Sequence, residues 1–260
     1  MCQNKCRFFG FNPRLKKCRV HWRAFTSGMS DEIGWRYYSH DSLSLDCSDL
    51  RDTGHTNSGV YKIYPNGNIS LPVRVYCNME TMDGGWTVIQ KRINGSLSFD
   101  QMWTDYKNGF GTPDQDVWIG NDIIHQLTKE KNSYLYVSIT LVNGTALYEL
   151  YNKFSISDEA GKYQLFLAGP ATGTLGDSML NTGYSWADQS GMYFTTPDRD
   201  NDGWSGGNCG VKWSGGWWFH ACYRAYLNGQ WYSADWSSDP WGTISTGQSV
   251  RETMMMIRRH

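Results

Sequence analysis

The fold of the C-terminal part of this chain is decided by the stretch Thr196-Pro197-Asp198-Arg199-Asp200-Asn201-Asp202-Gly203-Trp204-Ser205-Gly206-Gly207-Asn208-Cys209. Its three aspartates stand on alternate residues, in a segment whose proline and glycines disfavour a helix. Ca²⁺ prefers six to eight oxygen ligands, which short acidic side chains and backbone carbonyls in a glycine-bent loop supply. The pattern therefore predicts a calcium-binding loop. An acidic surface turn is the alternative.

The first six positions of this loop match the start of an EF-hand, but its end does not. Counted from Asp198 as position one, position twelve is Cys209, whereas an EF-hand has a bidentate glutamate there. No amphipathic helices flank the loop either. A cysteine at this position indicates a calcium loop that is fixed by a disulfide.

Charge is distributed unevenly along the 260 residues, although the net charge is only −1. Residues 1–30 hold seven basic and no acidic residues, which leaves 17 basic against 25 acidic residues in the remainder. An acidic body lacks the basic footprint that nucleic acids require. The basic N-terminal segment is interpreted as a solvated strand surface, with a polyanion site as the alternative.

Seven cysteines and three glycosylation sequons, at Asn68, Asn94 and Asn143, favour an oxidising, extracellular compartment and a secreted glycoprotein. No apolar run is long enough for a membrane-spanning helix. The chain begins without a recognisable signal peptide, so its start is interpreted as truncated.

Three parts are expected along the chain: a Cys-rich stub over residues 1–25, a polar linker over 26–45, and one domain over 46–260. Strands are predicted at 58–64, 73–79 and 85–91. Alternating Leu135, Val137, Ile139 and Leu141 predict a half-buried strand over 134–142. The Asn143-Gly144 turn should pair it with a strand over 146–154. Short helices are expected at 99–107 and 122–129. After about residue 170 the pattern becomes irregular, as is typical of functional regions held by cross-links or ions.

The order of motifs resembles the fibrinogen C-terminal domain, which occurs in fibrinogen chains, ficolins, tachylectins, angiopoietins and tenascins. The resemblance covers about four fifths of the chain, from Cys47 to Arg258, and includes Asp83-Gly84-Gly85-Trp86, Trp118-Ile119-Gly120-Asn121, Gly216-Trp217-Trp218-Phe219 and Met255-Met256-Ile257-Arg258. It implies an α+β fold, with a central antiparallel sheet, short helices and a loop-rich calcium and ligand subdomain. Residues 6–12 and 17–20 of the stub resemble the end of a PAN/apple module.

The resemblance also implies the cross-links and the metal ligands. The disulfides would be Cys47–Cys77 and Cys209–Cys222. The Ca²⁺ ligands would be the side chains of Asp200 and Asp202 and backbone carbonyls near Trp204 and Gly206, with Asp198 in the layer behind them.

In lectin-like members of this family, a pocket beside the calcium loop recognises acetyl groups. The corresponding frame here is a cis peptide at Ala221-Cys222, which turns the amides of Cys222 and Tyr223 toward a ligand. Its walls would be Trp213, Asp239 and Trp241. These residues differ from the usual lectin walls, so acetyl-sugar specificity is not expected to carry over directly.

The sequence therefore predicts a secreted, calcium-stabilised recognition domain. It would bind glycans or acetylated groups in innate immune pattern recognition and form oligomers only through segments outside this chain. The alternative is a matrix or signalling ligand that uses the same domain to bind an extracellular protein. Catalysis is not expected: Gly203-Trp204-Ser205-Gly206-Gly207 has the spacing of a nucleophile elbow, but lacks the preceding strand and following helix that the elbow requires.

Overall fold

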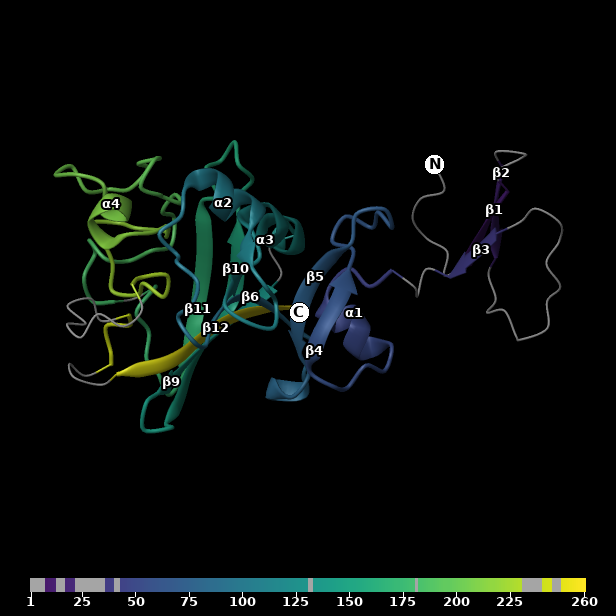
Figure 1. Ribbon diagram of the computed structural model, residues 1–260, viewed down its shortest axis with the longest axis horizontal. Coiled ribbons are helices and arrows are strands. Elements are labelled where there is room, and N and C mark those ends of the chain that lie inside the picture. Colours follow the sequence, from purple (N-terminus) through teal and green to yellow (C-terminus); the bar gives the residue numbers. More distant parts are fainter. Residues whose placement is uncertain are drawn as a thin grey trace.

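The computed structural model describes residues 8–12, 17–21, 36–39, 43–130, 133–180, 182–230, 240–244 and 249–260. Most of the described chain forms one body built on a large antiparallel sheet (Figure 1). The main path of this sheet has the order β11-β10-β9-β12-β6-β5-β4, and β8 joins it by pairing with β6 and β7. The α+β fold class is confirmed.

The strands of this sheet are β4 Gly59–Ile63, β5 Val73–Asn78, β6 Trp86–Arg92, β7 Phe110–Gly111, β8 Val117–Trp118, β9 Ser133–Leu141, β10 Ala146–Ile156, β11 Leu165–Gly173 and β12 Val250–Arg259. The helices are α1 Cys47–Asp52, α2 Trp103–Asn108, α3 Asn121–Thr128 and α4 Cys209–Trp213, with a 3₁₀ turn η2 at Thr81–Asp83. All five predicted strands and the second predicted helix are present within a few residues. The first predicted helix starts later than expected, at Trp103, and its first turn is closed by the Asp105 carboxylate, which accepts from the Met102 amide.

Alternation along β9 builds the two faces of the sheet. Leu135, Val137 and Ile139 are fully buried in the main core, while Tyr134 and Tyr136 lie partly buried on the other face. β10 pairs with β9 across the Asn143-Gly144 turn, as predicted. The face that holds the main core is covered by α2, by α3 and by the loop-rich C-terminal part of the chain.

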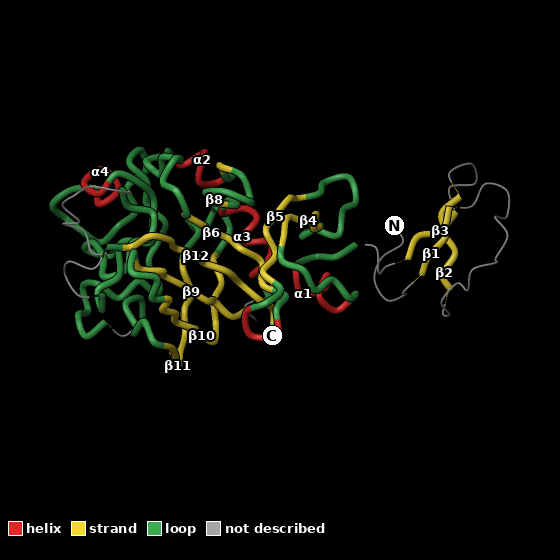
Figure 2. Tube along the Cα trace, turned by 60° about the horizontal axis from the view of Figure 1, so that its bottom comes forward, coloured by secondary structure: helices red, strands yellow, loops and turns green. Residues whose placement is uncertain are grey.

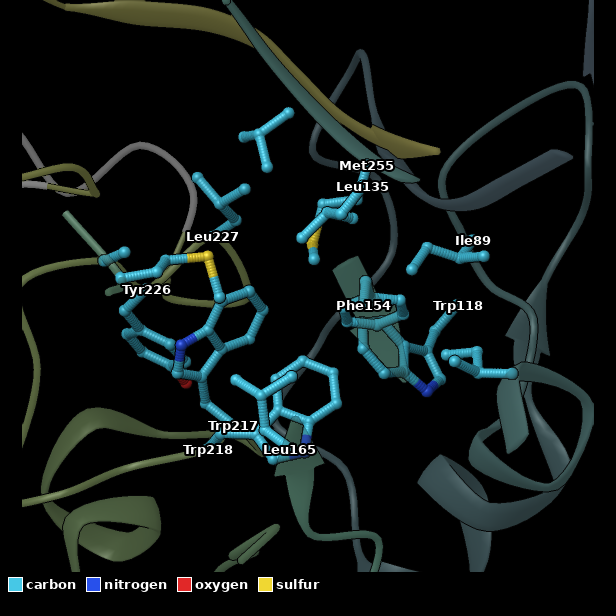
Figure 3. Packing of buried hydrophobic residues seen from close by; sticks show 14 of the residues in the cluster. Ile89, Trp118, Leu135, Phe154, Leu165, Trp217, Trp218, Tyr226, Leu227 and Met255 are labelled. Atoms are coloured by element: carbon cyan, nitrogen blue, oxygen red, sulfur yellow. The ribbon is translucent and has the colours of Figure 1, made fainter. Parts of the chain in front are cut away.

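Large aromatic side chains fill the space between the sheet and these loops (Figure 3). Trp118 from β8 and Phe154 from β10 meet Trp218, whose indole nitrogen donates to the Tyr163 carbonyl at 2.8 Å. Trp217 is equally buried, and its indole nitrogen donates to Gln189 Oε1 at 3.1 Å. Each aromatic ring therefore contributes apolar burial, and each indole N–H keeps a partner. The irregular segment predicted after residue 170 is in this way anchored to the sheet.

Three further strands lie in the N-terminal part: β1 Phe8–Asn12, β2 Lys17–His21 and β3 Arg36–Ser39, in the order β2-β1-β3. This small sheet stands apart from the main body in Figure 1. β3 falls within the segment expected to be a linker and pairs with β1 in the expected stub. The other residues of the stub and most of those of the linker lie outside the described residues.

Candidate functional site

The acidic loop (residues 196–209) is closed by the carboxylate of Asp202. Its Oδ1 accepts from the Trp204 amide at 2.8 Å, and its Oδ2 accepts from the Cys209 amide at 2.7 Å. One side chain thus joins the middle of the loop to its end, where α4 begins. The Asp–Gly-rich sequence permits this turn because short carboxylates readily bond nearby amides.

Asp200 lies beside Asp202 but is used differently. It is exposed, and its carboxylate accepts one hydrogen bond, from the Asp202 amide at 3.2 Å. Burial raises the pKa of Asp202, and the neighbouring Asp200 carboxylate adds to this rise, while the amides of Cys209 and Trp204 oppose it. A divalent cation between the two carboxylates would offset this repulsion and supply the charge that burial disfavours. The two carboxylates and the nearby backbone carbonyls are oxygen ligands of the kind that Ca²⁺ prefers, and the calcium site stays a prediction.

Asp198, the first aspartate of the loop, faces α2 instead. Its Oδ1 accepts from the Trp103 amide at the start of α2 at 2.9 Å and from Thr196 Oγ1 at 2.7 Å. The next residue, Arg199, places its guanidinium 4.1 Å from the centroid of the Trp103 ring. Asp198 thus fastens the acidic loop to the helical side of the domain.

Both disulfides implied by the resemblance are present, Cys47–Cys77 and Cys209–Cys222. The second joins the end of the acidic loop to the segment that contains the Ala221-Cys222 peptide bond, which is cis, as the resemblance implied. The Gly203 amide donates to the His220 carbonyl at 2.9 Å, so the two segments also meet through the backbone. The predicted metal loop and the predicted ligand frame are therefore adjacent.

Trp213 and Tyr223, two of the expected pocket residues, are brought together beside this disulfide. Trp213 is the last residue of α4, and its ring meets Tyr223 edge-on with centroids 5.3 Å apart. Tyr226 donates its hydroxyl to the Trp213 carbonyl at 3.3 Å and packs against Tyr223. The indole nitrogen of Trp213 is buried and has no acceptor among the described residues. These contacts fix the Trp213 and Tyr223 rings beside the position where the ligand pocket was expected.

The other two expected wall residues are not seen in that role. Trp241 is fully buried in the main core, and its indole nitrogen donates to the Gly176 carbonyl at 2.7 Å. Such a position is typical of a packing residue, because no face of the ring reaches the surface. Asp239 lies outside the described residues.

The structure adds an exposed aromatic cluster that the sequence reasoning missed. Tyr184 and Trp186 are 48% and 47% exposed, with ring centroids 5.6 Å apart. The Arg224 guanidinium lies 4.9 Å from the Tyr184 ring centroid, and the Trp186 carbonyl accepts from the Ala221 amide at 3.0 Å. We refer to Tyr184, Trp186 and Arg224 as the Tyr184 surface. Two aromatic residues two positions apart in a Gly/Ser turn, Gly183-Tyr184-Ser185-Trp186, were the available signal in the sequence.

The described part of the chain offers little support for a catalytic serine or for a cluster of metal-binding side chains. Ser205 sits in an exposed turn with no strand leading into it, and α4 begins four residues later at Cys209, so the surroundings of a nucleophile elbow are missing. No set of three or more His, Cys, Asp or Glu side chains is grouped for metal binding among the residues described. The expected calcium site uses only two carboxylates, the rest being backbone oxygens. No described helix has the length and apolar character needed to cross a membrane.

All three expected glycosylation acceptors, Asn68, Asn94 and Asn143, are exposed. Each asparagine side-chain oxygen accepts from the amide two residues on, at 2.9–3.0 Å. These turns keep the sequons at the surface, and their glycosylation stays a prediction.

Comparison with known proteins agrees with this architecture. Residues 43–260 match the family model of the fibrinogen beta and gamma chains, C-terminal globular domain. Human fibroleukin is 42% identical over 227 residues, which cover 82% of this chain and 51% of fibroleukin. Human angiopoietin-1 is 38% identical over 219 residues, which cover 82% of this chain and 42% of that protein. The chain thus spans about half the length of the curated relatives it matches.

Solved structures give the same result. The fibrinogen-like globe domain of human ANGPTL6 has a TM-score of 0.74 and 35% identity, covering 84% of this chain and 96% of that one. Lamprey fibrin D-dimer, solved with the peptide ligand Gly-His-Arg-Pro-amide, has a TM-score of 0.74 and 32% identity, covering 83% and 73%. The expected PAN/apple fragment precedes the matched residues and stays a prediction. With the sheet, both disulfides and the matched residues in agreement, the chain belongs to the family of fibrinogen C-terminal globular domains.

Proposed function

We propose that this domain is an extracellular, non-catalytic recognition domain that binds a protein partner through the Tyr184 surface. The observation that carries the proposal is the exposure of Tyr184 and Trp186 beside Arg224. Trp, Tyr and Arg are the residue types most enriched among those that dominate binding energy at protein interfaces. A neighbouring pair of half-exposed aromatic rings has no role in the core of the domain.

The Tyr184 surface is held in place before any partner binds. Arg224 donates through Nη2 to the Gly242 carbonyl at 2.6 Å while its guanidinium covers one side of the Tyr184 ring. Trp186 is tied through its carbonyl to Ala221, next to the Cys209–Cys222 disulfide. A surface fixed in this way loses little conformational freedom on binding, which favours affinity.

The relatives support the protein-binding alternative more than glycan recognition. The closely similar curated proteins include fibroleukin and angiopoietins, and one related fibrin was solved with a peptide ligand. Binding of glycans or acetylated groups ranks second. It is favoured by the meeting of Trp213 and Tyr223 at Cys222, but Trp241 is buried in the core.

Ca²⁺ is part of this proposal. The ion would be held by the carboxylates of Asp200 and Asp202 and by carbonyls near Trp204 and Gly206. Its role would be to fix the acidic loop against the segment that carries Ala221, and thereby to support the Tyr184 surface.

The proposal is tested by screening the intact chain against a panel of purified extracellular ectodomains and against a glycan array, each in Ca²⁺ and in EDTA. Trp186→Ala and Arg224→Ala are compared with Val211→Ala, which removes an apolar side chain that is 61% exposed on α4. Truncating one of the few residues that dominate an interface costs about 2 kcal/mol or more, so Trp186→Ala should weaken a protein hit by roughly 30-fold. Val211→Ala should leave it unchanged. Glycan hits without protein hits, or protein hits indifferent to both Tyr184-surface variants, would contradict the proposal.

A further inference from the structure

An opening of about 360 Å³ lies where α3, the end of β10 and the start of β11 meet. None of its lining residues belongs to the acidic loop or the Tyr184 surface, so it is separate from the site proposed above. Small-molecule sites in proteins begin at roughly this size. The chemistry of its walls indicates which small molecule would fit.

His125 is one of the residues that line this opening, and one of its ring nitrogens is left as a hydrogen-bond acceptor. Its Nδ1 lies 2.9 Å from the Ile156 carbonyl oxygen. A carbonyl oxygen can only accept, so Nδ1 carries the proton and donates. In the neutral imidazole, Nε2 is then the acceptor, and it has no partner among the described residues. A ligand hydroxyl could therefore donate to Nε2.

Among the described residues that line the opening, Lys129 supplies the only formal charge. It follows His125 by four positions and caps the C-terminus of α3 with helical backbone angles, so both side chains leave the same side of this helix end. Asp158 follows Ser157, one of the lining residues. Its carboxylate accepts from the Gly161 amide at 3.0 Å, so it is engaged in the turn that contains it. The domain as a whole has an excess of acidic residues, but the described residues that line this opening include a lysine and no carboxylate, which favours an anionic ligand.

The remaining walls combine apolar and polar groups. Ile156 and Leu165, which are buried in the main core, line the opening, and so does Phe166, which is 45% exposed. Gln164 donates through Nε2 to the Gly191 carbonyl at 2.9 Å, which directs its Oε1 away from that bond as a second acceptor. An aromatic ring with acceptors around it suits a sugar, because a pyranose has an apolar C–H face and hydroxyl donors at its edge.

We propose that this opening binds a sugar acid of the uronate class. The ligand carboxylate would pair with the Lys129 ammonium, a ring hydroxyl would donate to His125 Nε2, and the C–H face would lie against Phe166. A neutral sugar would lack the ion pair, and a simple carboxylate would lack the hydroxyl and ring contacts.

The test compares two probes that differ only at C6, methyl β-glucuronide and methyl β-glucoside, with acetate as the simple anion. Each is titrated into the intact chain, and binding is measured by isothermal calorimetry and by NMR shifts of assigned amides. We expect the glucuronide to bind more tightly than either other probe and to move the signals of α3 and of the start of β11. A surface ion pair contributes up to about 1 kcal/mol, so Lys129→Gln should weaken glucuronide binding by about fivefold and leave the weaker glucoside binding unchanged.

Two matched variants complete the test. Lys153→Gln removes an exposed lysine from β10 that does not line the opening, and it should bind like the unaltered chain. Trp186→Ala should also leave binding unchanged, so failure of the protein-binding proposal and failure of this one are distinguishable. The inference is overturned if glucuronide and glucoside bind equally, if acetate binds as tightly as glucuronide, if Lys129→Gln has no effect, or if no probe shifts the signals of α3.

Discussion

Asp202 and Asp200 should have separable roles, one in holding the acidic loop and one in binding Ca²⁺. Asp202 accepts two backbone amides, and a hydrogen bond to a charged group contributes roughly 1.5–3 kcal/mol. Since Asp202 is only partly buried, we take the lower part of this range and expect Asp202→Ala to cost about 3 kcal/mol without any metal. Asp200 accepts a single longer bond at the surface, and Asp200→Ala should cost about 0.5 kcal/mol or less in EDTA.

These values translate into different melting temperatures. A domain of this size loses about 2–4 °C per kcal/mol, so Asp202→Ala should melt roughly 6–12 °C below the unaltered chain in EDTA, while Asp200→Ala should nearly coincide with it. Ca²⁺ at a hundredfold excess over Kd should stabilise the unaltered chain by about 2.7 kcal/mol. Both variants should lose that gain if both carboxylates are ligands.

The assay is thermal unfolding followed by circular dichroism, in EDTA and in millimolar Ca²⁺, with Glu80→Ala as an exposed acidic control. Coincident melting of Asp202→Ala and the unaltered chain in EDTA would refute the structural role of its amide bonds. A full calcium shift in Asp200→Ala would refute its assignment as a ligand.

Three further outcomes follow from buried groups. Glu149 is buried, and burial raises its pKa in the folded protein above the ordinary value of 4.5, so the free energy of unfolding should fall as pH rises from the unfolded to the folded pKa. Urea unfolding across that pH window should show a weaker pH dependence for Glu149→Gln. An unchanged pH dependence would exclude Glu149 as the cause. Replacing both Cys47 and Cys77 by Ala opens a loop with a sequence separation of 30, which should cost about 4 kcal/mol in denaturant unfolding; a loss below about 1 kcal/mol would contradict the chain-entropy argument. Trp217→Phe leaves the buried Gln189 Oε1 without its donor and should cost about 1–3 kcal/mol beyond the lost packing; a calorimetric scan that matches the unaltered chain would show that the bond contributes nothing.

Local patterns predicted the part of the sheet whose two faces differ. β9 was visible because Leu135, Val137 and Ile139 enter the core while the residues between them lie partly exposed. β12 was not predicted, because it lies in the middle of the sheet and both faces of Met254-Met255-Met256 are covered, which removes the alternation. β11 was hidden by Gly169-Pro170, which disfavours a strand and lies where the pairing with β10 shifts register.

The candidate site could be predicted only where its contacts join residues that are close in sequence. The Asp200 carboxylate accepts from the Asp202 amide because these residues are two positions apart in a turning loop. Trp241 was expected to form a wall of the pocket, and its burial could not be read from local sequence because its partner, the Gly176 carbonyl, lies 65 residues away in the chain. The side chains around the opening at α3 come from four separate segments, and no spacing in the chain indicates that His125 and Gln164 face one space.

The central position of β12 has a consequence for how the domain is made. In Figure 2, β12 runs between β9 and β6, and these two strands do not pair with each other. A nascent chain that has not yet reached Val250 can form a β4-β5-β6 unit and a β9-β10-β11 unit, but no strand pairing joins these two units. β12 is synthesised roughly 160 residues after β6, a delay on the order of 8–30 s at ordinary translation rates. During that interval β6 and β9 each expose an unpaired strand edge, so β12 acts as the closing strand, and its arrival protects the new chain from aggregation.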